Sequence, residues 1–382
     1  MSQGTIISAN NHWGIWAILF LIAVFGLWAE KTKIGSKLSA VVVSILCAFV
    51  LANLSVIPTE APAYDIVWTY LVPLAIPLLL FKADLRRIIA EAGPTLLAFF
   101  FGTIGTLIGT FVSFALFSLG PEGWKLAGIF CSTYIGGSMN FVAVAQALQL
   151  KSGDLLTAGV AADNLVMTIY FIVLFTIPSI AIFRKLYLTK HDEKASQLDE
   201  NFTMEVPESN KPDLMDMGKS LAIGLTICAV GFGISDFIRI QGSGILIITA
   251  LVVSLATIFP KQIGTIKGAD QIGTLLMQVF FVVIGASANI RVVLRVGPVL
   301  FLFAGVILLI HLAFILIAGK IFKLDLAEIL IASNANMGGP TTAAAMAVAK
   351  KWKDLVIPAI LCGTLGYAIA TFIGVGIGNL LK

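Results

Sequence analysis

Two stretches decide the fold of this chain: CSTYIGGSMN, residues 131–140, and ASNANMGGPTT, residues 332–342. Each places a Gly-Gly pair among hydroxyl and amide side chains in the middle of a long apolar segment. Glycine readily adopts positive φ and opens a helix, and Pro340 removes a backbone donor and disfavours helical geometry in the residue before it. An opened helix frees backbone N–H and C=O groups, which a bilayer tolerates only where they face protein or water. The two stretches therefore predict a pair of interrupted helices.

The composition identifies the solvent of this chain as a lipid bilayer. Of its 382 residues, 58% are hydrophobic and 12% are charged, whereas soluble domains carry about 45–50% and about 25%. A single water-soluble core could not bury so much apolar surface. The formal net charge of +4 is small and suits the positive-inside rule better than nucleic-acid binding. The sequence thus predicts a multi-pass, all-α protein of the inner (plasma) membrane.

The sequence motifs of the common enzyme and pump classes are missing. It contains no Walker phosphate loop, no H-E-x-x-H zinc pair and no G-x-S-x-G nucleophile elbow. No Ser/His or paired Asp arrangement supplies the nucleophile and base of an intramembrane enzyme. We therefore expect neither an enzyme nor an ATP-driven pump, and no cofactor other than Na⁺ as a coupling ion.

Hydropathy divides the chain into segments of membrane-spanning length. A spanning helix needs roughly 17–25 residues that are mostly apolar. By this rule there are twelve hydrophobic segments, at 13–29, 38–57, 64–81, 95–119, 124–148, 155–183, 219–240, 244–260, 270–288, 296–319, 326–349 and 355–380. The long polar stretch 184–218 separates the first six from the last six, and its low apolar content predicts a flexible, cytoplasmic linker.

The two halves resemble each other. The Gly-Pro pair at 93–94 recurs at 297–298, 204 residues later, and the Gly-Gly pair at 136–137 recurs 202 residues later. Both Gly-Gly pairs interrupt the fifth segment of their half. The sequence therefore predicts two repeats of six segments, residues 1–183 and 219–382, each with a discontinuous or re-entrant fifth segment.

The orientation of the halves depends on that fifth segment. If it turns back inside the membrane, each half crosses five times and the halves are inverted. Of the 25 Lys and Arg residues, this topology places 19 inside and 6 outside, whereas twelve full crossings give 13 and 12. The difference comes wholly from charges in or beside residues 184–218. We predict inverted halves, with twelve crossings by parallel halves as the alternative.

Asp163 is an ionisable residue inside an apolar segment. It lies about 12 Å along the sixth segment from Leu155, well into the hydrocarbon. A charge there costs at least about 2.5–3.5 kcal/mol, which makes a functional site the default hypothesis. The carboxylate could bind Na⁺ or carry a proton; the alternative is an acid satisfied by neighbouring hydroxyls. His311, in the tenth segment, is interpreted as a helix-packing histidine, with a proton relay as the alternative.

We expect a binding site where the two interruptions meet. The N-termini of half-helices favour an anionic group, and freed carbonyls together with Asn and Thr oxygens suit Na⁺. The candidate solute- and ion-binding residues are Thr133, Gly136, Gly137, Ser138, Asn140, Asp163, Asn164, Asn334, Asn336, Gly338, Gly339, Thr341 and Thr342. Among them, Asn140, Asp163 and Asn336 are the candidates for holding Na⁺.

The paired motifs IGGSMN and NMGGPT, in a two-half layout over nearly the whole chain, resemble the bacterial domain-of-unknown-function family 819. That family is grouped with the cation:proton antiporter and anion transporter superfamily, which includes bile acid:sodium and glutamate:sodium symporters. The resemblance implies a core domain with two discontinuous helices that cross near mid-membrane, and a panel domain against which it moves. It also implies that the crossing is flanked by Ser138, Asn140, Asn334, Asn336, Thr341 and Thr342, with Asp163 adjacent. The first interrupted helix lacks the paired acidic motif of the antiporters, which favours symport.

These observations lead to three functional hypotheses. The first is a secondary transporter for a small anionic organic solute, coupled to Na⁺ or H⁺. The second is a cation/proton antiporter, and the third is a membrane receptor or scaffold without transport. The expected partners are a small solute and the lipid bilayer, without nucleic acid, and the large apolar faces allow a homodimer.

Overall fold

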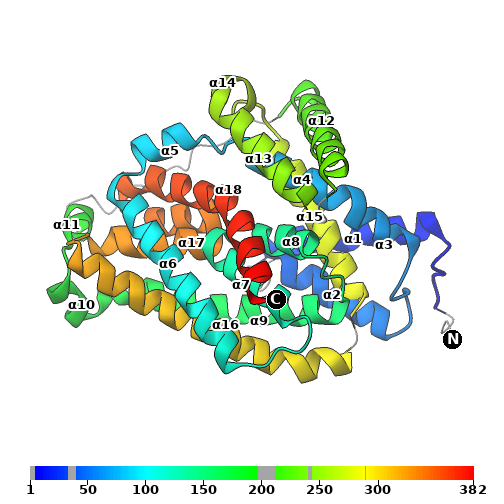
Figure 1. Ribbon diagram of the computed structural model, residues 1–382, viewed down its shortest axis with the longest axis horizontal. Coiled ribbons are helices and arrows are strands. Elements are labelled where there is room, and N and C mark those ends of the chain that lie inside the picture. The colour runs from blue at the N-terminus through cyan, green and yellow to red at the C-terminus, as the bar shows by residue number, and fades with distance from the viewer. Residues whose placement is uncertain (1–4, 33–39, 197–211, 240–242, 289) are drawn as a thin grey trace.

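The computed structural model describes residues 5–32, 40–196, 212–239, 243–288 and 290–382 (Figure 1). This part of the chain is helical, and its one β-type pairing is an isolated parallel bridge between Leu188 and Asp325. All twelve hydrophobic segments predicted from sequence coincide with a helix, or with a short run of helices. The prediction of an all-α polytopic membrane protein is confirmed.

The first six segments lead from the N-terminus to the linker. They are α1 (His12–Glu30), α2 (Ala40–Asn53), the run of α3 (Pro62–Ile66), η2 (Val67–Leu71) and α4 (Val72–Leu80), then α6 (Gly93–Leu116), α7 (Gly123–Gly136) with α8 (Ser138–Ala147), and α9 (Gly153–Thr176). The last six are α12 (Leu214–Ile238), α13 (Ser243–Ile258), α15 (Ala269–Ala286), α16 (Ile290–Ile321), α17 (Leu326–Ala349) and α18 (Val356–Leu381). Short connecting helices are α5 (Leu85–Glu91), η3 (Ile177–Ser179), α10 (Ala181–Leu186), α11 (Lys190–Ser196), α14 (Pro260–Ile263) and η4 (Lys353–Leu355).

Ten of these segments are apolar helices, or runs of helices, without a Gly-Gly pair. Eight helices in the described ranges are long and apolar enough to cross a bilayer, namely α1, the α3–α4 run, α6, α9, α12, α15, α16 and α18. The helices α2 and α13 are equally apolar but shorter. The two remaining segments are the ones that carry the Gly-Gly pairs.

The helices pack in two groups, which Figure 1 shows on opposite sides of the molecule. In the α15 group, α15 packs on α1, α2 and α4, and α12 and α13 pack on each other and on α4. In the α18 group, α18 packs on α7, α8 and α17, and α16 packs on α6 and α9. The main contacts between the groups are made by α2, α4, α13 and α15 on one side and by α8, α9 and α18 on the other.

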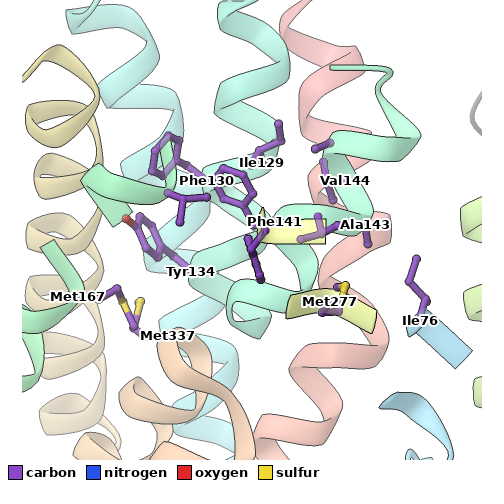
Figure 2. Packing of buried hydrophobic residues seen from close by; sticks show 14 of the residues in the cluster. Ile76, Ile129, Phe130, Tyr134, Phe141, Ala143, Val144, Met167, Met277 and Met337 are labelled. Atoms are coloured by element: carbon purple, nitrogen blue, oxygen red, sulfur yellow. The ribbon is translucent and has the colours of Figure 1, made fainter. Parts of the chain in front are cut away.

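The first Gly-Gly segment is a hairpin. The chain turns at Gly137, whose φ of 77° and ψ of 176° end α7 and begin α8. Near the turn, the rings of Phe130 and Phe141 lie 6.1 Å apart (Figure 2). At the far end, the Lys125 Nζ donates to the carbonyl of Gln149 over 3.2 Å. Because its two ends lie together, the segment folds back on itself; we call it the α7–α8 hairpin.

The second Gly-Gly segment, α17, turns back in the same way. It bends at Gly339, with φ 75° and ψ −165°. Its two ends are joined by consecutive linker residues: the His191 Nε2 lies 3.7 Å from a Glu328 carboxylate oxygen, and the Trp352 indole donates to Asp192 over 2.8 Å. We call this segment the α17 hairpin, with a first arm before Gly339 and a second arm after it.

Helix α18 shows that the two hairpins enter from opposite ends of the molecule. It starts beside the base of the α17 hairpin, just after Trp352. It ends beside the base of the α7–α8 hairpin, where the Lys382 Nζ lies 5.3 Å from the centre of the Trp124 ring. A helix of 26 residues spans roughly 39 Å, so the two bases are separated by the length of a membrane helix.

The predicted flexible linker 184–218 is partly structured, which differs from the expectation. Its first part continues α10 and forms α11, and α12 begins within it at Leu214; residues 197–211 lie outside the described ranges. Residues 187–192, the strap, are anchored to the protein. The Tyr187 hydroxyl donates to the carbonyl of Leu316 over 3.0 Å, and the backbone N–H of Lys190 donates to Asp325 over 2.7 Å. These contacts hold the strap against the end of α16 and the base of the α17 hairpin.

His191 is expected to make the strap sensitive to pH. The neighbouring Glu328 carboxylate, helped by Asp325 and Asp354, raises the pKa of His191 above its usual value, against an opposing effect of burial. Because the folded-state pKa is the higher one, the stabilisation is complete below about pH 6.5 and is lost as pH rises through the raised pKa. The thermal unfolding midpoint of the wild type should fall between about pH 6 and about pH 9 by more than that of His191→Gln. Parallel pH profiles for the two proteins would exclude this role.

Candidate functional site

The tips of the two hairpins touch each other. A Cβ atom placed on Gly137 would lie 3.4 Å from the backbone nitrogen of Gly339 and 3.5 Å from the carbonyl carbon of Gly338. Both tip residues have positive φ combined with extended ψ, a region that essentially only glycine occupies. The two Gly-Gly pairs therefore bring two backbone turns into van der Waals contact inside the helical core.

Helix α18 packs against both tips through glycine. A Cβ on Gly363 would lie 2.5 Å from the carbonyl carbon of Gly339, and one on Gly366 would lie 2.7 Å from the Ile135 oxygen. Only residues without a side chain allow backbones to approach so closely. The sequence did not predict this role of α18. The glycines of the last segment could have indicated it, but glycines at similar spacing also occur where membrane helices merely pack closely.

Each tip is braced by a hydrogen bond that spans eight residues. In the α7–α8 hairpin, the Ser132 hydroxyl contacts the Asn140 carbonyl at 3.3 Å. In the α17 hairpin, the Thr342 hydroxyl donates to the Asn334 side-chain oxygen over 2.7 Å. These pairs occupy positions that differ by 202 residues, the offset between the Gly-Gly pairs. Equivalent positions thus stabilise equivalent turns with different side chains.

Asn140 is buried, and both ends of its amide are bonded. Its Nδ2 donates to the Gly136 carbonyl over 2.8 Å, and its Oδ1 accepts from the Thr371 hydroxyl over 2.7 Å. Asn140 therefore ties the end of α7 to α18. Thr371 was not predicted, because nothing in the sequence distinguishes it from other threonines in apolar segments.

Three buried polar atoms at this site have no hydrogen-bond partner: the Tyr134 hydroxyl, Oδ1 of Asp163 and Oδ1 of Asn336. Within the described part of the chain, no other buried side-chain nitrogen or oxygen is left unpaired. A buried polar group without a partner costs about 1–3 kcal/mol, so native proteins rarely retain one without a reason. All three atoms lie beside the last turn of α7. The Tyr134 hydroxyl, in that turn, interacts with the Asp163 carboxyl group without the geometry of a full hydrogen bond. Asn336 donates to the carbonyl of Ile135 over 3.4 Å.

A cavity of about 100 Å³ lies beside Asp163. Its lining residues are Val41, Ser138, Phe141, Val160, Asp163, Asn164 and Phe281. They come from α8 and α9 of the α18 group and from α2 and α15 of the α15 group, so the cavity lies between the two groups. A water molecule occupies roughly 30 Å³, so the space suits an ion with a few waters or a very small solute. Asp163 is the one charged side chain in the lining.

The structure assembles the predicted site in part. Asn140, Asp163 and Asn336 all contact the last turn of α7, yet no hydrogen bond joins these three side chains to one another. Thr133 donates to the Ile129 carbonyl within its own helix, and Asn164 does the same toward Val160. Two further candidates are exposed at the helix starts that follow the breaks.

Those two exposed residues are Ser138 and Thr341. Ser138 also lines the cavity, whereas Thr341 is not among its lining residues. Among the residues that the structure describes, no group of three His, Cys, Asp or Glu side chains could hold a metal ion. The oxygens without a hydrogen-bond partner beside the last turn of α7 are those of Asp163, Tyr134 and Asn336, and oxygen ligands of this kind suit a hard cation rather than a transition metal.

The fold and the site define a class: a polytopic helical membrane protein in which two helical hairpins that start at opposite ends of the molecule meet tip to tip. Residues 17–382 match the family described as "Protein of unknown function (DUF819)", and the chain belongs to that family. It is also similar to "Uncharacterized membrane protein YjcL" of Bacillus subtilis (strain 168). The two are 35% identical over 389 residues, which cover 98% of each chain. The relative's name agrees with the membrane location expected from hydropathy.

Proposed function

We propose that this protein is a secondary active transporter for a small anionic organic solute, coupled to Na⁺ or H⁺. The observation that carries the proposal is the set of three unpaired buried polar atoms, on Tyr134, Asp163 and Asn336, beside the hairpin tips. Unpaired groups of this kind at mid-membrane are the binding groups that a transported ion or solute satisfies while it is bound.

The hairpin tips supply the electrostatics for an anion. Helix α8 and the second arm of α17 both begin at the tips, at Ser138 and Pro340, so their partial positive ends point to one region. The exposed side chains of Ser138 and Thr341 stand in the first turns of these helices. A carboxylate of the solute would be held by those helix N-termini, and the coupling cation by Asp163 on the other side of the cavity.

Alternating access would come from motion of the α18 group against the α15 group. The cavity lies between the groups, and each group draws three segments from each half of the chain. The opposite entry of the two hairpins supports inverted repeats, 1–183 and 219–382, with ten full crossings in total. Sliding one group past the other would open the site to one side of the membrane and close it to the other.

A cation/proton antiporter is the second candidate. It is favoured by Asp163 being the one charged residue that lines the cavity, because a single carboxylate can exchange a cation for a proton. Stimulation of solute uptake by an imposed Na⁺ gradient distinguishes the symporter. Sodium-driven proton efflux from vesicles without added solute distinguishes the antiporter.

The proposal is tested first by ligand-induced stabilisation. Purified protein is screened for a rise in thermal unfolding midpoint with a library of small organic anions, in NaCl and in choline chloride. We expect at least one anion to stabilise the wild type, and to do so less in the Asn336→Ala variant, because a ligand that binds only the folded state raises its stability. A receptor or scaffold with a vestigial site would show no anion-dependent shift.

The side of the membrane from which each hairpin enters can be tested by cysteine labelling. In a variant without the four native cysteines, Pro121→Cys and Gln149→Cys should react with a membrane-impermeant thiol reagent from the same side of the membrane. Both positions are exposed and flank the base of the α7–α8 hairpin. Lys353→Cys, at the base of the α17 hairpin, should react from the other side. Labelling of positions 121 and 149 from opposite sides would mean that the segment crosses fully.

A further inference from the structure

His311 is fully buried in the middle of α16, and both of its ring nitrogens have partners. Its Nδ1 lies 2.8 Å from the Gly102 carbonyl oxygen and 2.9 Å from the Thr106 hydroxyl, both on α6. Its Nε2 lies 3.0 Å from the Ser333 hydroxyl on the first arm of α17. That hydroxyl lies 2.6 Å from the Tyr170 hydroxyl on α9. One imidazole thus connects four helices of the α18 group through a continuous hydrogen-bonded chain.

The partners fix the position of the proton on this ring. A carbonyl oxygen only accepts, so the Nδ1 beside Gly102 carries the proton. The Thr106 hydroxyl donates to the Tyr134 carbonyl over 2.9 Å, which leaves its lone pairs free to share the Nδ1 proton. In the neutral ring Nε2 is bare, so Ser333 donates to it, and Tyr170 in turn donates to Ser333. Every donor in the chain then has an acceptor, and the direction of each bond is set.

This series of hydrogen bonds lies between Asn336 and Asp163, two of the three residues that have an unpaired oxygen. Asn336 follows Ser333 by one helical turn on the same arm, and its Oδ1 is packed against Gly102, where a Cβ would collide with it. Asp163 precedes Tyr170 by seven residues on α9, two turns away on the same face. The bond between Ser333 and Tyr170 therefore ties the arm that carries Asn336 to the helix that carries Asp163.

We propose that His311, held as the neutral Nδ1–H tautomer, is a positioning residue that fixes the first arm of the α17 hairpin against α6 and α9. It thereby sets the relative places of the free oxygens of Asn336 and Asp163. This inference rests on the proposed function only where those two oxygens are taken as part of the transport site.

The tautomer is tested directly by nitrogen magnetic resonance. The chain has three histidines, so His12→Gln with His191→Gln leaves His311 as the one isotope-labelled ring. We expect a protonated Nδ1 and a bare, hydrogen-bonded Nε2. Adding Ser333→Ala should shift the Nε2 resonance, since that nitrogen loses its donor, and should leave Nδ1 protonated. A proton on Nε2, or an Nε2 resonance that Ser333→Ala leaves unchanged, would overturn the assignment.

The positioning role is tested by the response to Na⁺. The concentration of NaCl that gives half of the thermal stabilisation, measured against choline chloride, should rise about tenfold in Ser333→Ala. Ser113→Ala is the matched control, because it too removes a buried serine hydroxyl that bonds to α16. The Ser113 hydroxyl, on α6, donates to the Phe303 carbonyl over 3.1 Å. We expect less than about a twofold change there. Equal responses of the two variants would overturn the positioning role. A wild type without any Na⁺ response would instead contradict sodium coupling, and the labelled histidine would still decide the tautomer.

Discussion

Replacing Asp163 by Asn should abolish coupled transport while leaving the protein folded. The substitution keeps the shape of the side chain but removes the one charge that lines the cavity. The Asp163 carboxyl group interacts with the Tyr134 hydroxyl, which the oxygen of an asparagine amide can still contact, and its Oδ1 has no hydrogen-bond partner, so the fold should survive the change. We expect the initial rate of gradient-driven uptake to fall by at least about a hundredfold, and the unfolding midpoint to stay the same or rise, because a buried charge is costly.

The control for this prediction is Asp154→Asn. Asp154 is an acid in the first turn of the same helix, α9, away from the cavity. The Asp154→Asn variant should retain most of the uptake rate of the wild type. If Asp163→Asn transports as fast as the wild type under both a sodium and a proton gradient, Asp163 does not carry the coupling ion.

Replacing Gly363 by Ala should produce the largest loss of stability. The new Cβ would lie 2.5 Å from the carbonyl carbon of Gly339 and would also collide with the nitrogen of Pro340. Both obstacles are backbone at a hairpin tip, so no side chain can rotate away. Overpacking of a core typically costs about 1–3 kcal/mol, and we expect a value near about 3 kcal/mol because the tip cannot yield. Binding should be lost as well, since the same tip positions the helix N-termini.

Gly376→Ala provides the matched control on the same helix. Gly376 is exposed and has no atom near the place of a Cβ. Alanine favours a helix over glycine by up to about 1 kcal/mol, so this variant should be neutral or slightly more stable. Unfolding in denaturant, or heating in detergent, measures both variants. If the two substitutions cost the same, the close packing of α18 on the hairpin tips is not what holds them.

The sequence predicted the helices because hydropathy depends on local composition. In a bilayer every spanning segment must be apolar along its length, so the signal is strong, and all twelve predicted segments appear as helices. The breaks were equally legible. Gly136-Gly137 and Gly338-Gly339 are pairs that a regular helix disfavours, and the chain turns at the second glycine of each pair.

That each broken segment folds back into a hairpin could not be derived from the sequence. It depends on contacts between residues far apart along the chain, such as Lys125 with Gln149 and the strap with Glu328 and Trp352. The charge count favoured inversion only through residues in or beside the linker. Part of that linker proved to be the strap that joins the two ends of the α17 hairpin.

The side chains of the candidate site were predicted by type but not by role. Asn140 and Asn336 both lie at the meeting point, yet Asn140 is fully bonded and Asn336 keeps a free oxygen. The Thr371 hydroxyl donates to Oδ1 of Asn140, whereas the Thr103 hydroxyl accepts from Nδ2 of Asn336 and donates to the Phe99 carbonyl, so it leaves Oδ1 of Asn336 free. No local pattern marks either threonine. Tyr134 was present in the opening stretch but was not selected. A tyrosine in an apolar helix is usually a packing residue, and its free hydroxyl becomes evident only beside Asp163.

The central claim is that this protein moves a small anion and a cation through a site at the meeting point of two hairpins. The most direct test is uptake into vesicles that contain the purified protein. A mixture of small organic anions is offered under an imposed sodium or proton gradient, and the vesicle contents are identified by mass spectrometry. We expect the wild type to accumulate at least one anion in a gradient-dependent way and Asp163→Asn to accumulate none. Identical contents for wild type, variant and empty vesicles under both gradients would contradict the account.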